Sequence, residues 1–155
     1  MFEDKLLDYT YSDWLQLVAI AATQRAYDGA AAQWSGDAPG HVVFNAIIVW
    51  SMAQLSNKSS APPWLIDYLK AQELVPLEKL WGQANTFDSD VVYPEGTLVM
   101  HFVAQEYGVQ AMPKLLKALG TAQSFVDVVE NGLGVPFAEF DQKWQAWIKD
   151  SRAEP

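Results

Sequence analysis

Apolar residues recur along most of the chain at spacings of three and four positions, which is the period of an α-helix that buries one face. Near the N-terminus the pattern runs through Leu15, Val18 and Ala22. Near the C-terminus it runs through Phe140, Trp144, Trp147 and Ile148. Short segments rich in glycine, proline and serine separate these stretches, as turns between helices do. The pattern predicts an all-α fold, a single compact multi-helix domain over residues 1–155 with about seven or eight helices.

The same pattern, together with capping residues, gives the expected helix positions. Ser124 is a typical N-cap, and Gly108 and Gly120 are typical residues at helix C-termini. Loops are expected over residues 35–40, 57–60 and 83–92. Helices are expected at about residues 14–34, 41–55, 62–69, 77–81, 94–107, 112–119 and 125–132, and a last helix is expected to begin at Pro136.

One segment, residues 38–57, has no charged side chain. Its apolar part covers only residues 42–53, whereas a membrane-spanning helix needs about 20 mostly apolar residues. A helix that is apolar on all sides is usually covered by other elements. The segment therefore predicts a central core helix and no membrane span. A strand at residues 42–44 is an alternative, since Val42 and Val43 are β-branched.

Amino-acid composition limits the classes of protein to which this chain can belong. The chain has 155 residues, of which 50% are hydrophobic and 19% charged, a composition that favours a folded core over disorder. Its formal net charge of −9 argues against a nucleic-acid partner, since such binding needs basic clusters. Cysteine is absent, which excludes disulfides and cysteine-ligated metals. The cellular compartment is left open.

A series of motifs in the C-terminal half has a recognisable order. The series consists of Pro63-Trp64-Leu65, Tyr93-Pro94-Glu95-Gly96, Tyr107-Gly108, Leu133-Gly134, Phe140 and Trp144. In this order the motifs resemble the helical C-terminal region of the gluzincin metallopeptidases, especially the small peptidase-MA-like group. The resemblance covers residues 62–148 and leaves residues 1–40 outside it.

The chemistry of that family depends on a His-Glu-x-x-His helix, which places two zinc ligands on one face and supplies the general base. The resemblance places Asn45 and Val49 at the two histidine positions and Ala46 at the position of the base. Asp67 corresponds to the glutamate that is the third zinc ligand. Tyr93 corresponds to the tyrosine that stabilises the oxyanion in related aminopeptidases.

The resemblance thus implies a peptidase-like scaffold whose zinc site is erased, because zinc hydrolysis needs about three protein ligands. We expect no metal, no other cofactor and a binding or structural role rather than catalysis. A peptide or protein is the expected kind of partner. The candidate cleft for it consists of Asn45, Val49, Trp64, Asp67, Tyr93 and His101.

Each candidate also has a simpler interpretation. Asn45 can be a buried amide with satisfied hydrogen bonds. Asp67 can face water or the dipole of an early helical turn, and the hydroxyl of Tyr93 can lie in solvent. His101 and Glu106 are five residues apart on one helix, a spacing that does not favour a shared metal.

Two alternative functions remain open at this point. One is a hydrolase in which Tyr93 works with carboxyl groups from Asp67, Glu95 or Glu106; two carboxyl groups with raised pKa values in one pocket would support it. The other is a helical oligomerisation or partner-binding module. An exposed apolar patch near Trp34 or Trp81, which lie beside predicted loops, would favour this module.

Overall fold

Helices make up all the regular structure that the computed structural model describes, which covers residues 28–31, 33, 35, 37–55, 63–71, 73–82 and 89–153. The all-α prediction is therefore confirmed. In chain order the elements are α2 (Asp28–Ala31), α3 (His41–Leu55), α4 (Pro63–Ala71), η2 (Leu77–Leu80), α5 (Ser89–Tyr107), α6 (Ala111–Leu119), α7 (Phe125–Leu133) and α8 (Phe137–Ala153).

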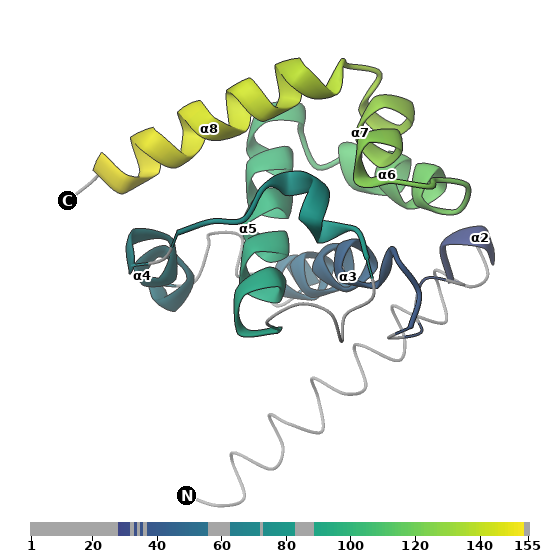
Figure 1. Cartoon of the computed structure of the whole chain (residues 1–155), viewed down its shortest axis with the longest axis horizontal. Helices are drawn as coiled ribbons and strands as arrows, with labels where there is room; N and C mark the ends of the chain where they lie inside the picture. Colours follow the sequence, from purple (N-terminus) through teal and green to yellow (C-terminus); the bar gives the residue numbers. More distant parts are fainter. Residues whose placement is uncertain are drawn as a thin grey trace, which may run out of the picture.

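Helix α5 is the centre of this arrangement (Figure 1). Its residues 95–103 are all buried, and α3, α4, α6 and α8 all contact it. In Figure 1, α3 lies beside the lower half of α5, whereas α8 passes across its upper end. Helices α6 and α7 pack on each other beside these elements. Because α5 contacts both α3 and α4, it is the element that positions the candidate site.

Helix α3 has the predicted bounds, and its residues from Val42 to Trp50 are buried except Asn45 and Val49. The N–H of Phe44 donates a 2.9 Å hydrogen bond to the carbonyl of Gly40, which is the spacing of an α-helix. The strand alternative at residues 42–44 is therefore wrong, because packing on α5 outweighs the β-propensity of Val42 and Val43. Among the described residues, no helix combines the length and the hydropathy that crossing a membrane requires.

The start of α5 differs from the prediction. A loop was expected up to residue 92, but the helix begins at Ser89 and holds Pro94 in its interior. Proline disfavours a helix interior, since it lacks an N–H and crowds the preceding turn. Tertiary contacts offset that cost: Val92 is buried, and the hydroxyl of Tyr68 on α4 donates a 3.1 Å hydrogen bond to the carbonyl of Val91.

The capping residues predicted from the sequence agree with the structure better than the predicted start of α5 does. The hydroxyl of Ser124 accepts a 3.1 Å hydrogen bond from the N–H of Asp127 at the start of α7. Gly134 ends the same helix with φ 71°, a left-handed conformation that favours glycine. Gly108 likewise follows the last residue of α5 and has φ 81°.

An aromatic cluster joins the C-terminal end of α5 to α8. Phe102 contacts the rings of Phe140 and Trp144 at centroid distances of 5.3 and 5.6 Å. Trp147 is half-buried, and its indole N–H donates a 2.8 Å hydrogen bond to Gln105. The inward positions predicted for Phe140 and Trp144 are thus confirmed.

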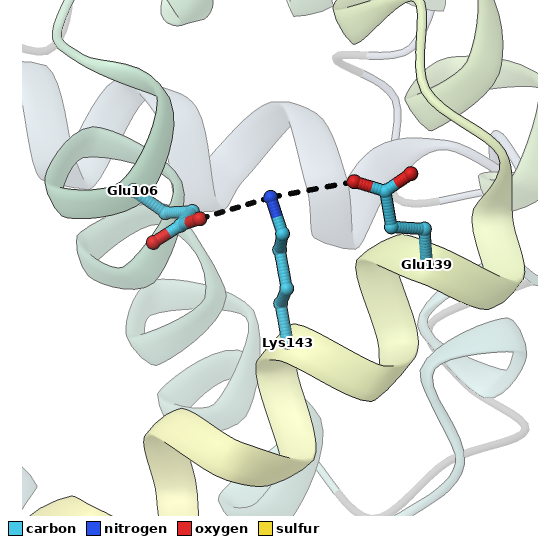
Figure 2. Close-up of polar contacts among 3 residues, drawn as sticks. All are labelled: Glu106, Glu139 and Lys143. Carbon is cyan, nitrogen blue, oxygen red and sulfur yellow. Dashed lines mark ion pairs between the residues drawn. The ribbon is translucent and has the colours of Figure 1, made fainter.

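A small charged network covers the edge of this cluster. Lys143 on α8 lies between Glu106 on α5 and Glu139 on α8 (Figure 2), with N–O distances of 3.0 and 3.4 Å. Its ammonium group also lies 5.3 Å from the centre of the Tyr107 ring. The two carboxylates raise the pKa of Lys143, and burial raises the pKa of the Tyr107 hydroxyl.

Several predictions fall outside the described residues. They are the helix over residues 14–27, the exposure of Trp34, the break at residues 57–60 and the loop over residues 83–88.

Candidate functional site

The accessible stripe of α3 is formed by His41, Asn45 and Val49, which are spaced four residues apart and so share one face. His41 and Asn45 are half-buried, and Val49 is 38% exposed. The positions between them are buried. Asn45 is therefore not a deeply buried core amide, and the two positions predicted to replace zinc-binding histidines lie on the open side of the helix.

The other face of α3 meets α5 at very close range. A Cβ atom added to Gly96 would lie 3.3 Å from the Cβ of Ala46 and 3.4 Å from a methyl group of Val42. Ala46 is 1% exposed. A glutamate in place of Ala46 would therefore have to enter a contact that is already filled.

Tyr93 lies one helical turn before Gly96 and contacts the beginning of α3. Its ring meets the ring of His41 edge-on, with centroids 6.0 Å apart and an interplanar angle of 87°. The carbonyl of Tyr93 accepts a 3.0 Å hydrogen bond from the hydroxyl of Thr97. Tyr93 is half-buried. The structure therefore brings Tyr93 to the end of the accessible stripe.

Helix α4 approaches the same end of α5. The hydrogen bond from Tyr68 to Val91 fixes α4 against the first turn of α5. Asp67, the preceding residue, is exposed, as its simpler interpretation predicted. The backbone of Trp64 lies in the first turn of α4, and its side chain is outside the described atoms.

His101 lies apart from these residues. It is eight positions beyond Tyr93 on α5, which is about 12 Å along a helix axis. It is 8% exposed, and burial lowers its pKa. Its environment is therefore the protein interior rather than the surface beside Tyr93.

The burial of Glu95 was not predicted from the sequence. Its side chain is fully buried, and one carboxyl oxygen, Oε2, accepts a 2.9 Å hydrogen bond from the N–H of Val75. The other oxygen, Oε1, has no hydrogen-bond partner among the described atoms. Burial raises the pKa of this carboxyl to about 7, although the bond from Val75 opposes the shift. No local pattern distinguishes it from an exposed helical glutamate.

The hydrolase alternative needs two such carboxyl groups in one pocket. Asp67 and Glu106 are exposed, on different helices, whereas Glu95 on α5 is fully buried and accepts a hydrogen bond from the N–H of Val75. These carboxyls therefore do not share an open site. Trp81 gives no support to the oligomerisation or partner-binding alternative, because its side chain is half-buried and packs on the hydrophobic core.

Potential metal ligands do not cluster in the part of the chain that is described. No group of three or more histidine, aspartate or glutamate side chains there could hold an ion. Comparison of the chain with protein-family models, curated proteins and solved structures finds no match in any of the three.

Proposed function

We propose that this chain is a non-catalytic, gluzincin-like domain in which the zinc site is replaced by a surface for a peptide or protein partner. One observation carries the proposal. Asn45 and Val49 lie on the accessible stripe of α3, while Ala46, between them, packs against Gly96. The resemblance predicts two missing ligands and a missing base at these three positions.

The side chains at these positions do not support zinc hydrolysis. Zinc ligands are imidazole, thiolate or carboxylate groups, whereas position 45 carries an amide and position 49 an isopropyl group. The methyl group of Ala46 cannot act as a general base. Of the predicted zinc ligands, only Asp67 keeps a suitable chemical group, and one carboxylate does not hold a catalytic ion.

The remaining groups suit recognition of a peptide. The amide of Asn45 can both donate and accept hydrogen bonds, and Val49 adds an exposed apolar surface beside it. Tyr93 borders the stripe through its contact with His41. A few polar groups next to apolar surface are typical of binding sites.

The first test is elemental analysis of the purified protein after dialysis against metal-free buffer. We expect no stoichiometric zinc. One zinc ion per chain would overturn the proposal and direct attention to His41, His101 and their neighbouring carboxylates.

A second test asks whether the former ligand positions still converge. The double variant Asn45→His, Val49→His places two imidazoles on one helical face. The control, Gln142→His with Ala146→His, does the same at two exposed positions of α8. If Asp67 lies where a third ligand belongs, the first variant binds zinc more tightly than the control.

Adding Asp67→Asn should reduce that affinity to the level of the α8 control. Equal zinc affinity in all three variants would show that the three positions do not converge, and the gluzincin-like alignment would be wrong.

A further inference from the structure

A groove separate from the α3 stripe lies between the segment that links α4 to α5 and the side of α8. Its volume is about 460 Å³, within the range typical of ligand sites. Its lining consists of residues 73–78 and of Asp141, Gln145, Ile148 and Arg152 on α8.

The two walls of the groove are long. One wall is a continuous run of residues, 73–78, whose first four have no helical structure. The other is one face of α8, from Asp141 to Arg152, which spans about 16 Å at the rise of an α-helix. That length accommodates about five residues of an extended chain, so the groove has the dimensions of a peptide site.

Both walls are held in place by interactions behind them. The N–H of Val75 donates a hydrogen bond to the buried carboxyl of Glu95, and Leu77 is 2% exposed. On the other side, Ile148 is buried, and the guanidinium Nε of Arg152 donates a 2.9 Å hydrogen bond to the carbonyl of Leu69. The groove is therefore formed by the fold itself, which reduces the ordering cost of binding.

The charges of the groove are unbalanced. Its lining holds the carboxylates of Glu73, Glu78 and Asp141 against the single guanidinium of Arg152. The lining also includes apolar side chains, namely Leu74, Val75, Leu77 and Ile148.

We propose that this groove binds an extended, basic peptide segment of a partner protein. Lysine or arginine side chains of the segment pair with the carboxylates on the two walls, and an aliphatic side chain between them contacts Val75 and Ile148. This site is independent of the α3 stripe, so it stands even if the gluzincin-like alignment fails.

The probe is a fluorescently labelled, end-blocked hexapeptide of alternating lysine and leucine, with glutamate in place of lysine in the control peptide. Binding to the full chain is measured by fluorescence anisotropy. We expect the lysine peptide to bind and the glutamate peptide not to bind. Absence of binding by the lysine peptide at millimolar protein would overturn the proposal.

Charge-reversal variants locate the site. Glu73→Lys with Glu78→Lys should weaken binding by about tenfold or more, because these carboxylates would contact the peptide. The control, Asp37→Lys with Asp150→Lys, changes the net charge equally at exposed positions that do not line the groove. It should weaken binding by less than about twofold. Equal losses would mean that the peptide responds only to the chain's overall charge of −9, and the groove would be rejected.

Two further measurements separate the contribution of the groove's shape to peptide binding from the contribution of its charge. Gln145→Trp fills the groove without changing its charge and should abolish binding, whereas unchanged binding would place the peptide elsewhere. Spermine should compete much more weakly than unlabelled peptide, since it has no side chain that can contact Val75 and Ile148. Equal competition by spermine would overturn the peptide assignment. Circular dichroism checks that every variant is folded.

Discussion

The backbone N–H of Val75 donates its hydrogen bond to a carboxyl group, Glu95, that is fully buried in the central helix. The bond therefore joins the segment after α4 to the core of the molecule. A carboxyl group in such a place favours its neutral form, because burial penalises the charged form.

Glu95 should make stability depend on pH. Its pKa is raised from 4.5 to about 7 in the folded chain. Between these values the unfolded chain releases the proton while the folded chain keeps it, so the free energy of unfolding falls as the pH rises from 4.5 to 7. The loss is at most about 3 kcal/mol, complete above pH 7.

Urea unfolding of the wild type and of Glu95→Gln at pH 4.5, 6 and 8 measures this effect. As the pH rises from 4.5 to 8, the wild type should lose stability relative to Glu95→Gln, because glutamine does not titrate. Asp150→Asn, at an exposed position of α8, is the control and should follow the wild type. Parallel curves for the wild type and Glu95→Gln would contradict the prediction.

His101 should make the free energy of unfolding depend on pH in the opposite direction. Burial lowers its pKa below 6.5, so between the lowered value and 6.5 the unfolded chain binds a proton that the folded chain does not. Stability is therefore lost as the pH falls through this window. NMR titration of the imidazole Cε1–H signals should show a midpoint below 6.5 for His101, with His41→Gln used to assign the two signals. A midpoint at or above 6.5 would refute the buried environment.

Two helical glycines should respond differently to alanine. Both substitutions gain about 1 kcal/mol of helix propensity, but the added Cβ at Gly132 would lie 2.9 Å from a methyl group and 3.2 Å from the Cα of Leu115. At Gly96 the nearest atom is the Cβ of Ala46 at 3.3 Å, and a movement of a few tenths of an ångström between α3 and α5 relieves the contact. Thermal unfolding should therefore show Gly132→Ala as the less stable protein, by about 1–3 kcal/mol relative to Gly96→Ala. The reverse order would mean that α3 and α5, not α6 and α7, form the tighter contact.

The network around Lys143 should matter little for stability. Its side chain and the two glutamates it bridges are all well exposed, and exposed ion pairs are weakened by side-chain entropy and by salt. Lys143→Met keeps the aliphatic stem over Tyr107 and should change the melting temperature less than Trp144→Ala does, since Trp144 is fully buried. Any change should shrink in high salt. A large, salt-independent loss would show that the contact with Tyr107 dominates.

The helices and their caps were largely predictable because the signals that set them are local. Ser124 and Gly134 act through neighbours within four residues, and the bounds of α3 follow from a continuous apolar segment. The exception is the start of α5, where the contacts of Val91 and Val92 with distant residues outweighed the local preference of Pro94.

The candidate site was predictable only in part. The spacing of Asn45 and Val49 determines that they share a face of α3, but it does not determine which face the rest of the molecule covers. The contact of Gly96 with Ala46, the contact of His41 with Tyr93 and the enclosure of Glu95 each join residues 20 or more positions apart.

The sequence by itself therefore determined the fold class, most helix positions and the absence of any His-Glu-x-x-His motif. Only the tertiary structure decided that Asn45 and Val49 are accessible, that His101 and Glu95 are buried and that an acidic groove lies beside α8. The physical reason is that helix formation depends on neighbours within about four residues, whereas burial, and with it the pKa of a carboxyl or imidazole group, depends on which helices pack together.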